Sequence, residues 1–147
     1  MDCYADAYFS GLWGHEDPQD PICARSRTGF VVTFANCPLL WMSKLQTEIV
    51  LSTLHSESVA LSHSVRALLP LKSLIKEMLD NLGVDSEKLK FLSSSTIYED
   101  NNRAIVVSTS PRMTTTSKHI ALLFLVPVGT YFHLEPSHVV QIWQSKY

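Results

Sequence analysis

The chain has 147 residues, which is enough for one domain with a sizeable hydrophobic core. Hydrophobic residues make up 46% of it and charged residues 18%, a balance that excludes an intrinsically disordered chain. The formal net charge is -2, which excludes a strong general binder of polyanions. A nucleic-acid substrate would therefore need metal ions or an attached partner to supply most of the attraction.

No targeting or membrane segment is predicted. Residues 1–4 carry no basic stretch and no apolar run, so we expect no signal peptide. The most apolar run, residues 120–134, contains Pro127 and Gly129 and is too short to cross a bilayer. We expect an intracellular protein, in the cytoplasm or the nucleus, that is not secreted.

Cysteine usage points to the same kind of compartment. Cys3, Cys23 and Cys37 are odd in number and have no CxxC spacing, so thiols are expected rather than disulfides. A zinc site formed by Cys23, Cys37 and His15 is conceivable, but its spacing is unspecific.

The first third of the chain predicts strands. Residues 3–9 read as a short strand, and residues 11–26, with Gly and Pro among charges, read as a loop. Residues 29–35 are rich in β-branched and aromatic residues. With a turn and a second strand at residues 39–43 they predict a hairpin. Residues 45–51 alternate weakly and predict a further strand.

A long helical pattern follows. Ser52 or Thr53 is the expected N-cap, and leucines and other apolar residues recur at helical spacing from Leu61 onwards. Gly83 ends the pattern, as glycine commonly does after a helix. Pro70 interrupts it at a cost of about 3 kcal/mol, so we expect a kink or two abutting helices there.

The remaining elements complete a mixed α/β arrangement. After a polar connection, residues 94–99 predict a strand that ends at Asp100, residues 101–108 predict a short helix, and residues 109–117 predict a Ser/Thr/Pro loop. The order strand, hairpin, long helix, strand, helix predicts a central mixed sheet with the long helix packed on one face. Functional sites in such folds gather where strands end near helix starts, which is where Asp100 lies.

Three carboxylates occupy three separate contexts: Asp6 in the first strand, Glu57 early in the long helix and Asp100 at the end of a later strand. Taken singly, each has a structural explanation, and Asp100 could cap the helix that follows it. Brought together they would repel one another unless a hard cation neutralised them. Mg²⁺ takes such oxygen ligands, and a pair of ions can clamp the two reacting oxygens of a phosphodiester.

Five short blocks of sequence follow one another over residues 3–120. They are Tyr4–Ala7 with Gly11, Arg25–Phe30, Trp41–Lys44 with Gln46 running on through Leu51–Thr53 to Ser56–Ser62, Tyr98–Asn102 with Ala104 and Ile105, and Ser117–Ile120. Any one block is weak, but in this order they are specific. The chain resembles the ribonuclease H domain at the end of the polyprotein of copia-type retrotransposons.

The resemblance implies a fold, an activity and a set of roles. The fold would be ribonuclease H-like, with a mixed five-stranded sheet and helices on its faces. The activity would be hydrolysis of the RNA strand of an RNA–DNA hybrid with two divalent ions, Mg²⁺ or Mn²⁺. Asp6, Glu57 and Asp100 would be the catalytic metal ligands. The partners would be the hybrid and a reverse transcriptase domain of the same polyprotein, with no membrane and no small-molecule cofactor. Substrate contacts would come from Ser43, Lys44, Asn101, Lys118 and His119.

The chain also departs from the family pattern. His55 stands where the family usually has an acid, so Glu57 is preferred as the ligand, with small residues at Ala60 and Ser64 allowing the helix to lie close to the sheet. After Ile120 the resemblance ends. No aspartate follows Asp100, and Gln141 stands roughly where a fourth carboxylate is expected. We therefore predict a ribonuclease H-like domain at residues 1–120 and a divergent segment at residues 121–147, packed on or replacing the end of that domain.

Two functions remain open at this stage. One is a metal-dependent nuclease weakened by the loss of the fourth carboxylate. The other is a catalytically inactive retroelement remnant that acts at most as a nucleic-acid or protein interaction domain. A shift of reading frame is one hypothesis for the foreign tail, and the underlying DNA would test it.

Overall fold

The computed structural model describes residues 1–12, 19–85, 94–109 and 139–144. The predicted loop at residues 109–117, the two residues Lys118 and His119, and the predicted boundary after Ile120 fall almost wholly outside these ranges. No helix within them is both long enough and apolar enough to cross a membrane.

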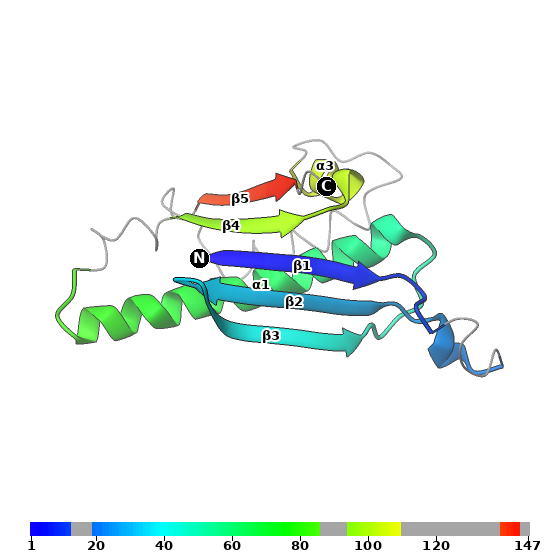
Figure 1. Ribbon diagram of the computed structural model, residues 1–147, viewed down its shortest axis with the longest axis horizontal. Helices are drawn as coiled ribbons and strands as arrows, with labels where there is room; N and C mark the ends of the chain where they lie inside the picture. Colours follow the sequence, from blue (N-terminus) through cyan, green and yellow to red (C-terminus); the bar gives the residue numbers. More distant parts are fainter. Residues whose placement is uncertain (13–18, 86–93, 110–138, 145–147) are drawn as a thin grey trace.

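The described strands form one mixed sheet with a helix behind it (Figure 1). The strands are β1 (Asp2–Tyr8), β2 (Arg27–Phe34), β3 (Cys37–Leu45), β4 (Ser94–Glu99) and β5 (Val139–Gln144), in the order β3-β2-β1-β4-β5. The first three pair antiparallel, whereas β4 runs parallel to both β1 and β5. The expected mixed α/β class is confirmed. A short 3-10 helix, η1 (Pro21–Ala24), lies in the connection before β2.

The predicted hairpin is confirmed. β2 and β3 are joined by Ala35 and Asn36, whose φ values are 50° and 62°. Two successive positive φ angles make the type of two-residue turn that matches the right-handed twist of paired strands. Asn tolerates this conformation, which explains its place there.

The further strand predicted at residues 45–51 is wrong. Leu45 already ends β3, and the chain then turns towards the long helix. The buried Gln46 fixes this turn: its side-chain amide donates to Thr28 Oγ1 and to the carbonyl of Ser56, both at 3.0 Å. Buried polar anchoring of this kind outweighs a weak apolar alternation.

The long helix α1 (Thr53–Asn81) begins where it was expected to begin. Ser52 is the N-cap, and its hydroxyl accepts from the backbone N–H of His55 at 3.2 Å. Gly83 follows the helix with a φ of 74°. The prediction of two abutting helices is wrong, because α1 runs unbroken through Pro70. Pro70 has no N–H to donate to the carbonyl of Arg66, four residues earlier. Both residues lie on the exposed side of α1, where water can donate a hydrogen bond to that carbonyl.

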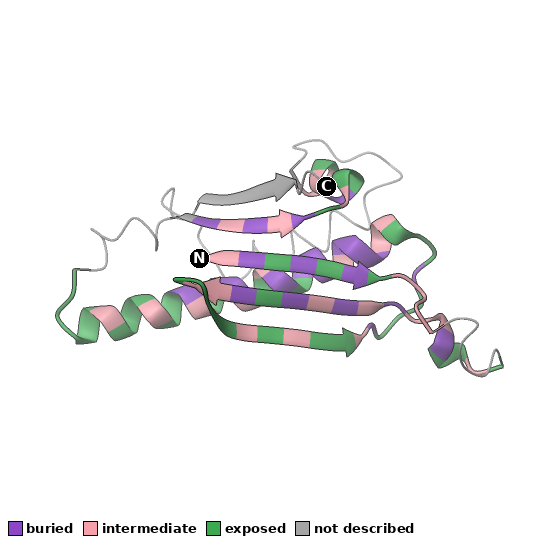
Figure 2. Cartoon of the chain, viewed as in Figure 1, coloured by how far each residue is buried: buried purple, intermediate pink, exposed green. Residues whose placement is uncertain are grey.

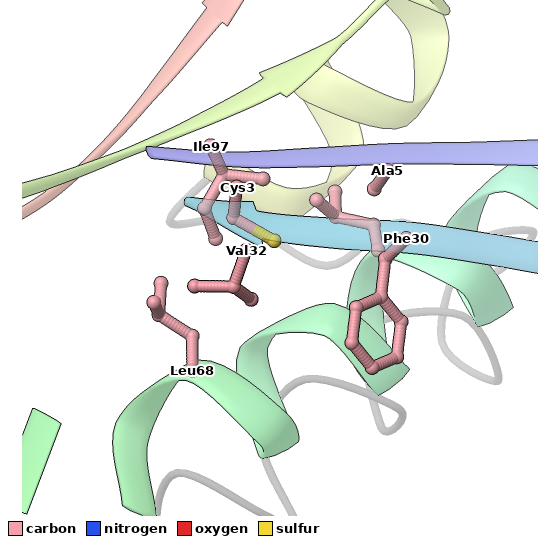
Figure 3. Close-up of a cluster of buried hydrophobic side chains, with 7 residues drawn as sticks. Cys3, Ala5, Phe30, Val32, Leu68 and Ile97 are labelled. Carbon is pink, nitrogen blue, oxygen red and sulfur yellow. The ribbon is translucent and has the colours of Figure 1, made fainter. Parts of the chain in front are cut away.

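The hydrophobic core lies between α1 and the sheet. Alternate residues of β1 are buried (Figure 2), and Cys3 and Ala5 join Phe30, Val32, Leu61, Leu68 and Ile97 in one cluster. Figure 3 shows Leu68 of α1 beneath the strands that carry Val32 and Cys3. Burial along α1 ends at Lys72, and beyond it the helix extends past the sheet (Figure 1).

Replacing Leu68 by Ala should lower the free energy of unfolding by about 2–5 kcal/mol, because the buried leucine leaves a cavity under the sheet. Chemical denaturation followed by circular dichroism measures this loss. Leu74→Ala is the matched control on the same helix, since Leu74 is 52% exposed, and should change stability by less than about 0.5 kcal/mol. Equal losses in the two variants would contradict this placement of the core.

The sheet face opposite α1 carries a row of apolar side chains. Backbone register aligns Trp41, Val31, Tyr4 and Tyr98 across four neighbouring strands. The rings of Tyr4 and Tyr98 stack with centroids 4.7 Å apart, and Trp41 is 68% exposed. Tyr4 and Trp41 line an open groove of about 400 Å³, which also reaches Asp6. We call the three aromatic residues, Trp41, Tyr4 and Tyr98, the aromatic row.

Candidate metal centre

Sheet register brings Asp6 and Asp100 to the same level. β1 and β4 are parallel, with Asp2 opposite Thr96 and Tyr4 opposite Tyr98, so the same offset places Asp6 level with Asp100. The pairing of β1 with β4 ends at Tyr4, opposite Tyr98. The edge of β1 beside Asp6 is thus left for another group to approach.

The third carboxylate, Glu57, fills that position from α1. The helix starts at the same end of the sheet at which β1 and β4 finish (Figure 1). Glu57 is only 8% exposed, and its carboxylate accepts from the backbone N–H of Ala7. Ala60 and Ser64 are both fully buried, so the expected close approach of this helix face to the sheet is confirmed.

The three predicted carboxylates therefore meet. One oxygen from each of Asp6, Glu57 and Asp100 lies within 4.8 Å of the others, with Asp6 and Asp100 exposed and Glu57 buried. In an octahedral shell with metal–oxygen bonds of about 2.1 Å, ligand oxygens are about 3 to 4.2 Å apart, so small side-chain shifts would let all three reach one ion. Glu57 Oε2 is buried without a hydrogen-bond partner, as expected for an oxygen that would coordinate a cation.

Crowding of negative charge perturbs the buried members of this group. Burial, together with the charges of Asp6 and Asp100, raises the pKa of Glu57 to about 7. The cluster also contains a residue that the sequence interpretation missed. Glu99 is 1% exposed, and burial raises its pKa to about 8, with contributions from the charges of Glu57, Asp100 and Asp6. The signal in the sequence was the pair Glu99-Asp100 at a strand end, where alternation turns Glu99 towards the same face as the buried Ile97.

Capping of the short helix α3 (Asn102–Thr109) falls to Asn101, so the capping explanation for Asp100 is wrong. Asn101 Oδ1 accepts from the backbone N–H groups of Arg103 and Ala104 at 3.0 and 3.2 Å. Asp100 is exposed and lies one residue before the cap. It is therefore available to the carboxylate cluster.

The predicted substrate-contacting residues lie in different surroundings. Ser43 is exposed and lines the groove beside Asp6, since Gly29 pairs with both residues. Lys44, its neighbour on β3, is exposed and lines a separate small pocket with His63. The backbone N–H of Asn101 donates to Glu99 Oε1, and the side-chain oxygen of Asn101 caps α3. Lys118 and His119 lie outside the described residues.

Gln141 does not take the place of a fourth carboxylate. It pairs with Thr96 in the middle of β5. Its backbone therefore lies four residues short of the level of Asp100, or about 13 Å along the strand. The zinc alternative gains no support either: among the described residues, the possible metal-binding group consists of Asp6, Glu57 and Asp100, and His15 lies outside them. None of the three cysteines forms a disulfide.

Comparison with known proteins supports a retroelement origin. The chain is 29% identical over 96 residues to the Retrovirus-related Pol polyprotein from transposon TNT 1-94 of Nicotiana tabacum. The match covers 65% of this chain but 6% of that polyprotein. No family model matches the chain. The fold and this similarity together define a mixed α/β domain similar to part of a retrotransposon Pol polyprotein.

Proposed function

We propose that this chain is a ribonuclease H-like domain that hydrolyses the RNA strand of RNA–DNA hybrids with two divalent ions, Mg²⁺ or Mn²⁺. The observation that carries the proposal is the convergence of Asp6, Glu57 and Asp100 from three different elements at one end of the sheet. The similarity to a Pol polyprotein is in keeping with a domain that acts beside a reverse transcriptase domain of the same polyprotein.

Each side chain has a distinct task in this proposal. Asp6 and Asp100 are exposed at neighbouring strand ends, so they would face both the ions and the scissile phosphate. Glu57 accepts a hydrogen bond from the Ala7 N–H and would provide the third carboxylate ligand from α1. The bound ions would activate a water molecule and stabilise the leaving 3′ oxygen. Ser43 and Lys44 on β3, together with Asn101, Lys118 and His119, are the proposed contacts to the hybrid.

Cleavage of a labelled RNA–DNA hybrid tests the proposal directly. The full chain should cut the RNA strand in Mg²⁺ or Mn²⁺, should stop in EDTA, and should leave duplex DNA of the same sequence intact. Because the net charge is -2, binding should be weak, so the assay needs low salt and high protein concentration. A well-folded chain that cuts in neither metal would reject the nuclease.

The aromatic row favours a second candidate, a catalytically inactive remnant that binds single-stranded nucleic acid. Bases stack on exposed aromatic rings with about 1–3 kcal/mol each. In EDTA, Trp41→Ala should weaken binding of a fluorescent oligonucleotide by about tenfold or more, whereas Leu74→Ala should leave it unchanged. Binding that is insensitive to Trp41, or no binding at all, would remove this candidate.

A further inference from the structure

Glu99 is a buried carboxylate that the proposed three-ligand site does not use. It shares a face of β4 with Ser95 and Ile97, both fully or nearly fully buried, and is itself 1% exposed. The residue directly after it is Asp100. A carboxyl group at this depth needs partners, because an unsatisfied buried acceptor is costly.

The two oxygens of Glu99 have different surroundings. Oε1 accepts from the backbone N–H of Asn101 at 3.1 Å. This hydrogen bond spans Asp100 and fixes the position of the Asn101 backbone. Asn101 in turn caps α3. These contacts hold the backbone on both sides of Asp100.

The second oxygen, Oε2, is buried and accepts no hydrogen bond. The negative charges that act on the Glu99 carboxyl are those of Glu57, Asp100 and Asp6, the three members of the candidate centre. Glu57 Oε2 is likewise buried without a partner. Two buried acceptors that lack donors thus belong to carboxyl groups that interact with the candidate centre: Glu57 is one of its members, and Glu99 precedes Asp100 in the chain and interacts with all three members.

We propose that Glu99 is a positioning residue of this centre, which holds Asp100 through Oε1 and accepts from a water molecule of the hydrated cation through Oε2. The inference rests on the proposed function, because it needs a divalent ion between Asp6, Glu57 and Asp100. Mg²⁺ dehydrates reluctantly and keeps several waters, whose protons require acceptors. Acceptors in the outer shell orient the ligands and commonly change metal affinity by about 10–100-fold.

Titration of the full chain with Mn²⁺ alone, followed by calorimetry or by the electron paramagnetic resonance signal of the ion, tests this role. Glu99→Gln keeps an oxygen for the Asn101 N–H but replaces the other oxygen by an NH₂ group. It should weaken Mn²⁺ binding by about 10–100-fold without loss of the folded circular dichroism spectrum. The matched control is Glu77→Gln, which removes the same charge from an exposed position on α1 and should bind as the unaltered chain does.

Glu99→Asp separates position from charge. It keeps the carboxylate but withdraws it by one methylene group, so it should also bind Mn²⁺ more weakly than the unaltered chain. Unchanged affinity in Glu99→Gln would overturn the inference, and unchanged affinity in Glu99→Asp would show that charge alone matters and would overturn it too. If the unaltered chain binds no Mn²⁺ at millimolar concentration, the metal centre itself is rejected and this inference is rejected with it.

Discussion

Asp100→Asn should abolish metal-dependent cleavage of an RNA–DNA hybrid, with a loss of at least about 10²–10³ in rate. The amide keeps the size of the side chain and removes the negative charge that a divalent ion needs. Asp100 is exposed, and Asn101 rather than Asp100 caps α3, so the substitution spares the local fold. Single-turnover cleavage with Mg²⁺ and with Mn²⁺ measures the effect.

The control for that experiment is Asp80→Asn, which removes a carboxylate from an exposed position near the far end of α1. It should cut at the rate of the unaltered chain. Cleavage by Asp100→Asn at more than about a tenth of the normal rate would show that the reaction does not depend on this carboxylate. It would contradict a two-ion site in which Asp100 is a metal ligand. Equal melting temperatures for the variants and the unaltered chain establish that folding is not the cause.

Stability of the metal-free chain should fall as the pH rises from about 4.5 to about 8. Glu57 and Glu99 have an ordinary pKa of 4.5, which the fold raises to about 7 and about 8. The folded state therefore holds more protons than the unfolded state across this window, and stability declines with pH. Each carboxyl contributes at most about 1.4 kcal/mol per pH unit, and less when the two titrate together. Below about pH 4.5 both states are protonated, so the stabilising contribution is fully present.

Urea unfolding in EDTA at several pH values checks this decline, with Glu57→Gln as the comparison. The variant should show a flatter profile, because the amide cannot ionise. The difference between the two profiles isolates the effect, since burial lowers the pKa of His63 and of Lys72 and makes those groups act in the opposite sense. Addition of Mn²⁺ should restore stability at pH 8, where the carboxylates are ionised and can bind it. Parallel profiles for the two proteins would contradict the raised pKa of Glu57.

Much of the architecture follows from local patterns in the sequence. Residues 3–9 were predicted as a strand and correspond to β1, the β-branched run predicted β2, and Ser52 together with the apolar spacing predicted the start of α1. Each of these signals is carried by neighbouring residues, so no knowledge of the tertiary fold is needed to interpret it. The resemblance to a family then indicated which three carboxylates belong together.

Other features depended on contacts between distant segments. Gln46 ends the hairpin because it reaches Thr28 and Ser56, which no local pattern reveals. Pro70 is accommodated within one helix because it falls on the exposed side of α1. Gln141 stands in the sequence roughly where a fourth carboxylate is expected, but strand pairing sets its backbone opposite Thr96, four residues short of the level of Asp100.

The sequence by itself determined the first strand, the hairpin, the long helix, the later strand and the short helix after it, and the identity of Asp6, Glu57 and Asp100 as a candidate set. The tertiary structure alone decided how they meet, through the parallel register of β1 with β4 and the approach of α1. It also revealed Glu99, whose importance comes from burial beside three other carboxylates rather than from any spacing. The physical reason is that desolvation and charge repulsion depend on the distance between side chains in space, which the linear sequence does not contain.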